Sequence, residues 1–205
     1  MHIPFVVYDG YFGETERICN LIIDDYDGGW QMGEYLKRMG HEKVLCIADN
    51  YICMDKERIE GCKAALGELK VGFLQIPFEK EARKRMYRER LGEILEYTAV
   101  FAVSDFYAAE LMHSLQEQGI CVPDDISVAG FDDSPLCERV SPELTSVRQD
   151  TKERAKQAVR LLSKLKQGIW DEQTVRLPVY LVERGSVKMM ELKKKSGGKY
   201  GEDSK

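Results

Sequence analysis

The chain has 205 residues, of which 43% are hydrophobic, and its 30 Lys and Arg against 35 Asp and Glu give a net charge of −5. These values are typical of a soluble globular protein and exclude disorder, a collagen-like repeat and a membrane-spanning architecture for the chain as a whole. Because a protein that grips DNA by its phosphates needs a basic face, the acidic balance also argues against direct DNA binding.

The cysteines and histidines give no sign of a metal centre or a disulfide framework. The six cysteines form no C-x-x-C pair, and the three histidines are scattered without the spacing of a zinc site. The first residues lack the charged region of a signal peptide, and no run approaches the roughly 18 apolar residues of a membrane span. We therefore expect a reduced cytoplasmic protein with no metal, no cofactor and no membrane partner.

Short apolar runs alternate with amphipathic segments along the chain. The amphipathic segments predict helices at residues 28–39, 55–69, 79–95, 106–118 and 151–166. The apolar runs predict strands at residues 5–8, 19–23, 44–48, 71–76, 99–103, 127–131 and 175–182, with a further short run at 144–147. Pro178 interrupts the last strand, which suits a sheet edge. This alternation predicts an α/β fold with a mostly parallel sheet and helices on both faces.

Polar side chains follow nearly every predicted strand, and in parallel α/β sheets ligands bind beyond the carboxyl ends of the strands. Carboxylates accept hydroxyl protons, an arginine donates in a planar fork, and an aromatic ring covers the apolar face of a sugar. Such a set suits a polyhydroxylated ligand. The side chains in question are Asp9, Asp24, Asp25, Asn50, Tyr51, Phe78, Ser104, Asp105, Asp132, Asp133, Arg148 and Gln149, together with Arg58 near the start of a helix.

A second interpretation stays open for each of these residues taken singly. Asp and Asn at strand ends form turns and cap helices, and Asp105, which precedes a helix, is a candidate cap. For any one aspartate this structural role is favoured by roughly two to one. Convergence of several polar groups from different strands favours a ligand site instead.

The sequence lacks the motifs of enzymes that use a similar set of carboxylates. A magnesium-dependent phosphotransferase needs a second carboxylate two residues after its nucleophilic aspartate, and Asp9-Gly10-Tyr11 does not provide one. No G-x-x-x-x-G-K-[ST] or G-x-S-x-G motif is present, and no G-x-G-x-x-G opens a helix. We therefore expect that the chain is not an enzyme.

Two motifs carry a resemblance to a known family. Residues 100–105 read V-F-A-V-S-D, and residues 119–133 read G-I-C-V-P-D-D-I-S-V-A-G-F-D-D. The second motif strongly resembles the sugar-sensing domain of the LacI/GalR family of bacterial transcription regulators. Further matches follow in the family's order, and the resemblance covers residues 3 to 187. They are Gly40-His41, Arg58 with Gly61, the L-T-S-V-R-Q run at 144–149, and the closing segment at 177–186.

The resemblance implies a periplasmic-binding-protein-like (type I) fold of two α/β lobes, with the effector in the cleft between them. It also implies which residues bind the ligand, and these agree with the strand-end pattern. The implied set is Asp9, Arg58, Phe78, Ser104, Asp105, Asp132 and Gln149. The chain departs from the family where Ser104 replaces the usual Asn and Met54 replaces a small polar residue, which implies a less polar wall on that side of the pocket.

Members of the family begin with a helix-turn-helix DNA-binding domain, a hinge and the first strands of the N-terminal lobe, and this sequence contains none of them. We therefore expect a chain truncated at its N-terminus, with an incomplete N-terminal lobe. The expected division assigns residues 1–23 and 148–173 to the partial N-terminal lobe, 24–147 and 174–188 to the C-terminal lobe, and 189–205 to a polar tail.

The resemblance implies the effector-sensing domain of a DNA-binding repressor, in which a small sugar-like ligand between the lobes switches operator binding. Operator DNA is then contacted only through the absent N-terminal domain, and the chain is expected to form a homodimer. The alternative is a transport-type sugar-binding receptor with the same fold, against which the missing signal peptide argues. We expect Arg58→Ala to abolish effector binding while leaving the fold intact.

Overall fold

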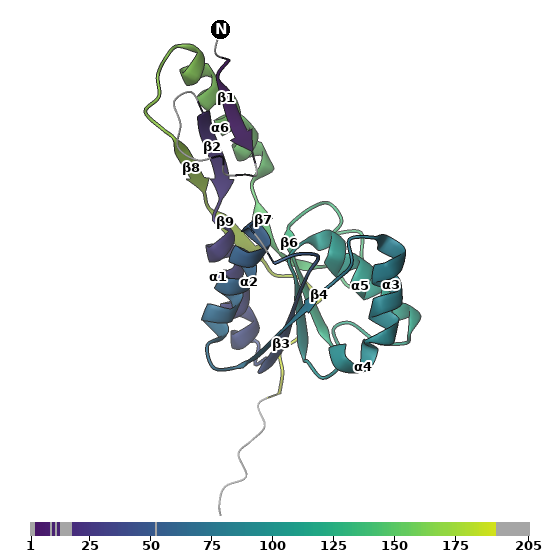
Figure 1. The fold of residues 1–205 in the computed structure, drawn as a ribbon. Coiled ribbons are helices and arrows are strands. Elements are labelled where there is room, and N and C mark those ends of the chain that lie inside the picture. Colours follow the sequence, from purple (N-terminus) through teal and green to yellow (C-terminus); the bar gives the residue numbers. More distant parts are fainter. Residues whose placement is uncertain (1–2, 9, 11, 13–17, 52, 192–205) are drawn as a thin grey trace, which may run out of the picture.

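Two sheets organise the computed structural model, which describes residues 3–8, 10, 12, 18–51 and 53–191. The smaller sheet is parallel and has the order β1-β2-β8. Helix α6 (Thr151–Lys166) packs against this sheet, and together they form the upper body in Figure 1, which we call the smaller lobe. Its strands are β1 (Phe5–Tyr8), β2 (Ile18–Ile23) and β8 (Thr174–Leu177).

The larger sheet has the order β4-β3-β5-β6-β7-β9, and with its helices it forms what we call the larger lobe. Its strands are β3 (Lys43–Ala48), β4 (Lys70–Gln75), β5 (Ala99–Ala102), β6 (Ser127–Asp132), β7 (Thr145–Gln149) and β9 (Val179–Val182). The pairs are parallel except for β7 with β9. The helices on one face are α1 (Asp25–Arg38) and α2 (Cys53–Leu66), and those on the other are α3 (Lys80–Glu89), α4 (Leu91–Ile94) and α5 (Asp105–Glu117).

The buried side chains of the larger sheet alternate between these two helical layers. In β3, Val44 and Cys46 belong to the cluster that contains the α1 and α2 side chains. Leu45 and Ile47, which lie between and after them, belong to the cluster with α3, α4 and α5. A strand that is buried on both faces reads as a continuous apolar run, which is why the pattern predicted these strands well.

The predicted α/β fold is confirmed, and two elements differ from expectation. The helix expected over residues 79–95 is interrupted at Arg90, whose backbone (φ −103°, ψ 14°) departs from helical geometry between α3 and α4. The strand expected over 175–182 is two strands in two different sheets. Thr174–Leu177 pairs with β2, and Val179–Val182 pairs with β7.

The division at Pro178 corrects one of the expected lobe boundaries. Residues 174–177 belong to the sheet of the smaller lobe rather than with residues 24–147. Proline has no N–H to donate to a strand ladder, so one strand ends at Leu177 and the next begins at Val179. β9 is indeed an edge strand, as expected, and it lies at the edge of the larger sheet.

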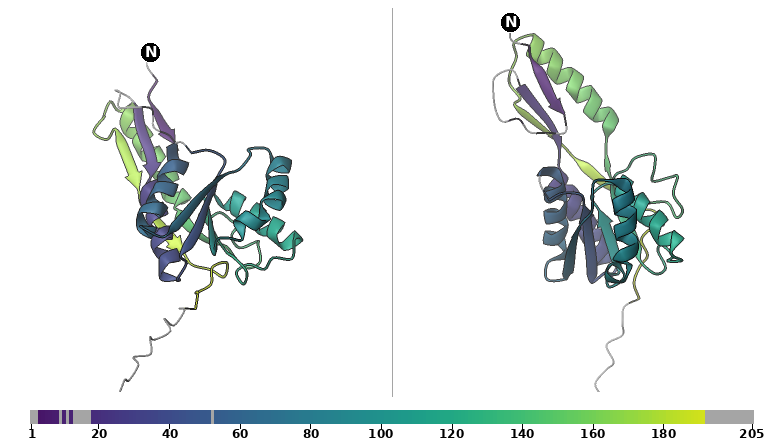
Figure 2. Two further views of the ribbon diagram at one scale, coloured as in Figure 1. Left: turned by 60° about the horizontal axis from the view of Figure 1, so that its bottom comes forward. Right: turned by 45° about the vertical axis from the view of Figure 1, so that its right-hand side comes forward.

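Within the described residues the chain passes between the sheets at three places. These lie between β2 and α1, between β7 and α6, and between β8 and β9. Each crossing follows the carboxyl end of a strand, so the carboxyl ends of both sheets meet where the lobes join (Figures 1 and 2). Any ligand site at the strand ends is therefore bordered by both lobes.

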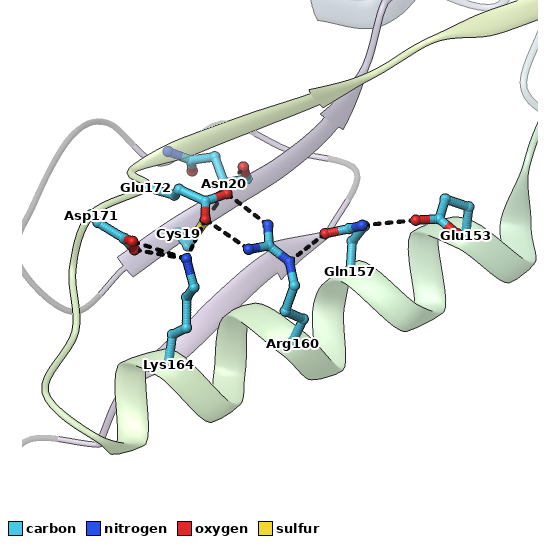
Figure 3. Close-up of polar contacts among 8 residues, drawn as sticks. All are labelled: Cys19, Asn20, Glu153, Gln157, Arg160, Lys164, Asp171 and Glu172. Carbon is cyan, nitrogen blue, oxygen red and sulfur yellow. Dashed lines mark hydrogen bonds and ion pairs between the residues drawn. The ribbon is translucent and has the colours of Figure 1, made fainter.

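An ion-pair network ties the segment before β8 to α6. Arg160 donates to Glu172 in a bidentate manner at 2.7 and 2.6 Å, and Lys164 donates to Glu172 at 2.5 Å and to Asp171 at 2.9 Å (Figure 3). These hydrogen bonds lower the pKa of Glu172 to about 2. The network lies at the surface over a small apolar core around Leu21 and Leu161.

We expect Glu172→Gln to lower the stability of the smaller lobe by about 1 kcal/mol or less, because exposed ion pairs contribute little. The loss should still be measurable, because the substitution weakens the pairs with Arg160 and with Lys164 at once. The folded-state pKa of Glu172 lies below its unfolded value, so its contribution is complete above the unfolded pKa and is lost as the pH falls towards 2. Hydrogen exchange of α6 and β8 at pH 7 and pH 3 measures both effects. Glu68→Gln, on the exposed turn after α2, is the control. Equal exchange in all three proteins would contradict the prediction.

Candidate ligand-binding site

Arg58 lies at the carboxyl ends of the larger sheet with only 7% of its surface exposed. Its Nε atom donates to Asp25 Oδ1 at 2.7 Å, and Nη1 donates to the carbonyl oxygen of Val103 at 2.6 Å. The guanidinium lies over the Phe131 ring, with its central carbon 3.8 Å from the ring centroid. These contacts hold the guanidinium in one orientation and so reduce the entropy that binding a ligand would cost.

The depth of Arg58 is set by a close contact between α1 and α2. A Cβ atom at Gly29 would lie 1.9 Å from the Arg58 carbonyl oxygen, and one at Gly61 would lie 2.0 Å from the carbonyl oxygen of Tyr26. Only glycine lets the two backbones approach this closely. Because α1 begins at Asp25, the helix that packs on α2 also supplies the carboxylate that binds Arg58.

Asp132 ends β6 and lies beside Arg58. Its Oδ1 atom is 3.6 Å from Arg58 Nη1 and accepts a hydrogen bond from the amide of Gln149, at the end of β7. Burial, with smaller contributions from the carboxylates of Asp105 and Asp25, raises the pKa of Asp132 to about 6 against the opposing effect of the Arg58 charge. The backbone of Asp132 has a φ of +114°, which is rare outside glycine and is typically retained at functional sites.

Asp105 has a different environment, because the fold uses both of its carboxylate oxygens. Oδ1 accepts from the Ser146 hydroxyl and Oδ2 from the Ser134 backbone N–H, each at 2.6 Å. The residue is 1% exposed, and burial raises its pKa. Ser104, rather than Asp105, caps α5 by accepting from the Tyr107 backbone N–H. Asp105 therefore joins the segment after β6 to the start of β7, and these contacts are those of a structural residue.

Phe78 and Asp9 complete the predicted set. Phe78 follows β4 at the same edge of the larger sheet and is 83% exposed, with its carbonyl oxygen held by Arg83. Asp9 lies outside the described residues, and its predicted role stays a prediction.

The structure thus brings Arg58, Asp132 and Gln149 together and leaves Phe78 and Ser104 at the rim. Sequence reasoning placed Asp25 among the strand-end residues but not in the site, and it missed Arg154, which bonds to Gln149. No sequence signal distinguishes Arg154 from the other cations of its helix. In the described part of the chain, no group of three or more His, Cys, Asp or Glu side chains is arranged to hold a metal ion.

A second acidic group lines the rim between β3 and α5. Burial raises the pKa of Asp55, and nearby Asp49 raises it further. Tyr107 has a pKa raised to about 12, first by burial and then by Asp49. The rim therefore offers carboxylate and phenol oxygens around Arg58, the groups that suit ligand hydroxyls.

Comparison with known proteins identifies the family. Residues 34–187 match the family described as the periplasmic binding protein-like domain. The chain belongs to this family. Within the described residues, no helix has the length and apolar content needed to cross a membrane.

The relatives narrow the assignment to the effector-binding domain of the LacI/GalR family, as the sequence motifs predicted. The chain is 34% identical over 198 residues to the HTH-type transcriptional repressor PurR of Vibrio atlanticus (strain LGP32), covering 92% of this chain and 58% of that protein. It is 34% identical over 176 residues to the HTH-type transcriptional regulator DegA of Bacillus subtilis (strain 168), covering 81% and 51%. The chain thus spans little more than half of these relatives, which are regulators rather than enzymes.

Solved structures agree with this assignment. A LacI family transcriptional regulator from Enterococcus faecium with bound ribose superposes with a TM-score of 0.82 at 28% identity, covering 92% of this chain and 72% of that one. A regulator from Enterococcus faecalis V583, also with bound ribose, gives the same TM-score at 29% identity and covers 92% and 70%. The two-lobe, type I fold predicted for this LacI/GalR domain is confirmed.

The contacts of Arg58 change the expectation that Arg58→Ala leaves the fold intact. Removing the guanidinium leaves the Asp25 carboxylate buried without its partner, so we expect a loss of about 3–5 kcal/mol in the free energy of unfolding. Arg58→Ala/Asp25→Asn should be less destabilised than the single variant, because no unpaired charge remains. Urea denaturation measures both.

The control is Arg38→Ala, which removes an exposed pair with Glu183 and should cost about 1 kcal/mol or less. An Arg58→Ala loss no larger than that of the control would contradict the prediction. So would a double variant less stable than Arg58→Ala.

Proposed function

We propose that this chain is the effector-sensing domain of a LacI/GalR-type transcription regulator and that it binds a small sugar-like ligand where its two lobes meet. The observation that carries the proposal is the buried Arg58 beside Asp132 at the strand ends. Both residues lie at the carboxyl ends of the strands, where open α/β sheets bind ligands. The regulators that share this fold and sequence support the regulatory part.

The chemistry of the site favours a neutral, polyhydroxylated ligand. Asp132 accepts ligand hydroxyl protons, Arg58 donates to ligand oxygens, and Gln149 can do either. Phe78 covers an apolar ring face, and Asp9 is proposed to reach the ligand from the end of β1. Ser104 lies at the wall, whereas Asp105 supports the site through Ser146. The excess of carboxylates over guanidinium groups disfavours a phosphorylated ligand.

The proposed mechanism is a shift between two arrangements of the lobes. A ligand that binds groups on both sides of the crossings prefers one arrangement and populates it at the expense of the other. In an intact regulator that arrangement would set the affinity for operator DNA, and the coupling would be reciprocal. Control of transcription requires contact with DNA, which supports a cytoplasmic location for the protein. A transport-type receptor is disfavoured because the matched relatives are transcription regulators.

We also propose that the chain forms a homodimer through the surface between α3 and α5. A groove of about 390 Å³ lies there, lined by the apolar side chains of Phe106, Ala109, Leu136 and Val140. Phe106 is 51% exposed, and contiguous apolar patches on soluble proteins mark interaction sites. Regulators with helix-turn-helix domains bind two half-sites as dimers, which favours a second copy as the occupant.

The ligand proposal is tested by calorimetry with D-ribose, D-xylulose, lactose and cellobiose. We expect one of these sugars to bind, and Asp132→Asn to bind it about ten- to a hundredfold more weakly, because a hydrogen bond to a charged acceptor contributes roughly 1.5–3 kcal/mol. With a pKa of about 6 for Asp132, wild-type affinity should fall as the pH drops below 6, since protonation removes the acceptor. The affinity of Asp132→Asn should show no such fall.

Failure of all four sugars to bind the wild-type protein would overturn the proposed ligand class. An affinity of the wild-type protein that does not change between pH 7 and pH 5 would remove Asp132 from the set of ligand acceptors.

The dimer is tested by analytical ultracentrifugation. We expect the wild-type chain to sediment at twice its mass of 23.5 kDa, and Phe106→Glu to sediment as a monomer because the charge would be buried at the interface. Tyr180→Glu, on an exposed aromatic of β9, is the matched control and should remain dimeric. A wild-type monomer at the highest soluble concentration would contradict the proposal.

A further inference from the structure

A chain of polar contacts runs from the candidate site into the smaller lobe. Asp132 Oδ1 accepts from the Gln149 side-chain amide nitrogen, and the Gln149 amide oxygen accepts from Arg154 Nη1. Arg154 stands on the first turn of α6, and its guanidinium carbon lies 4.2 Å from the centroid of the Tyr8 ring at the end of β1. The contacts therefore join a carboxylate of the larger lobe to a helix and a strand of the smaller one.

The position of Arg154 is unusual for a cation. It lies on the inner face of α6, seven and eleven residues before Leu161 and Leu165, whose side chains form the core of the smaller lobe. Only 2% of its surface is exposed, and burial lowers its pKa. A leucine would fill this position without the cost of desolvating a charge, so packing alone does not account for the arginine.

The chemistry of the contacts explains what an arginine adds. A glutamine amide carries an acceptor oxygen at one end and a donor NH₂ at the other, and the two ends have nearly the same shape. A guanidinium has only donors, so it bonds to the oxygen of Gln149 and leaves the NH₂ group facing Asp132. In the opposite orientation, the amide oxygen would face the carboxylate and repel it.

We propose that Arg154 is a positioning residue, which acts from the smaller lobe to orient the Gln149 amide and, through it, holds the Asp132 carboxylate as a ligand acceptor. The inference deepens the proposed function and rests on it for the role of Asp132 in binding. Its structural part, the control of Asp132 through Gln149, stands on the contacts alone. This arrangement would make the Asp132 carboxylate sensitive to the relative placement of the two lobes.

The other groups that face Asp132 come from the larger lobe. They are Arg58 on α2, Asp25 on α1 and Asp105 on α5, and Gln149 faces it from the end of β7. Arg58 and Gln149 favour the charged carboxylate, whereas Asp25 and Asp105 disfavour it. Loss of the ordered amide should therefore raise the pKa of Asp132, because one of the two favourable contacts disappears.

The experiment measures the pKa of Asp132 in the ligand-free protein by ¹³C NMR titration of the carboxyl carbons, with Asp132→Asn identifying the resonance. We expect Arg154→Leu to raise the pKa by about one unit, the size of one hydrogen bond to a charged group. Arg154→Lys, which keeps a donor, should restore most of the shift. Arg160→Leu, on the same helix but bonded to Glu172, should leave the pKa unchanged.

A second variant keeps the test decisive if Arg154→Leu does not fold. Gln149→Met removes the amide while leaving Arg154 in place, and it should produce the same rise. An unchanged pKa of Asp132 in a folded Arg154→Leu or Gln149→Met protein would overturn the proposal, as would an equal shift in Arg160→Leu.

Sugar binding separates this inference from the proposed function. If a sugar of the panel binds, Arg154→Leu should weaken it several-fold, and Arg154→Lys should bind nearly as well as wild type. If none binds but the pKa of Asp132 still moves, the ligand class is wrong while the positioning role holds. If a sugar binds with unchanged affinity to Arg154→Leu, the positioning role is overturned and the proposed function stands.

Discussion

A buried guanidinium organises the region where the two lobes meet. Arg58 is removed from water, and a charge in such a place is tolerated only when its partners are built into the fold. Asp25 supplies the countercharge, Val103 a carbonyl oxygen and Phe131 a ring face. Each partner comes from a different part of the fold, so the position of this one charge depends on how α1, α2, β6 and the residue after β5 pack together. The glycine contacts between α1 and α2 let that packing close.

Burial, rather than the Arg58 charge, sets the state of the neighbouring carboxylate. Asp132 lies beside Arg58 and beside two further acidic groups, and burial outweighs the attraction of the guanidinium. A carboxyl group with a pKa of about 6 is largely ionised at neutral pH, and in the proposed role it accepts a hydrogen bond from a ligand hydroxyl.

The topology connects this site to the second lobe without a long pathway. β7 ends at Gln149, α6 begins two residues later, and the first turn of α6 returns Arg154 to the Gln149 side chain. Two hydrogen bonds, from Arg154 to Gln149 and from Gln149 to Asp132, therefore connect α6 of the smaller lobe with Asp132 of the larger lobe. In the described part of the chain the lobes are joined by three crossings, and the hydrogen bond between Arg154 and Gln149 is the contact on which the proposed positioning role rests.

The sequence by itself determined the α/β fold and the order of most strands and helices, and it placed Arg58 and Asp132 among the predicted ligand residues. These follow from local hydrophobic patterns and from a motif that is contiguous in the chain. The sequence could not show that Asp25 and Asp105 have different roles, since both are aspartates that begin a helix after a buried strand. Their roles differ because Asp25 meets a guanidinium and Asp105 meets two serines, and those partners are 33, 29 and 41 residues away. In the same way, only the tertiary structure shows that residues 174–182 contribute to two sheets and that the Arg154 side chain is buried. The physical reason is that strand pairing and the burial of a charge depend on contacts between segments that are distant in the chain.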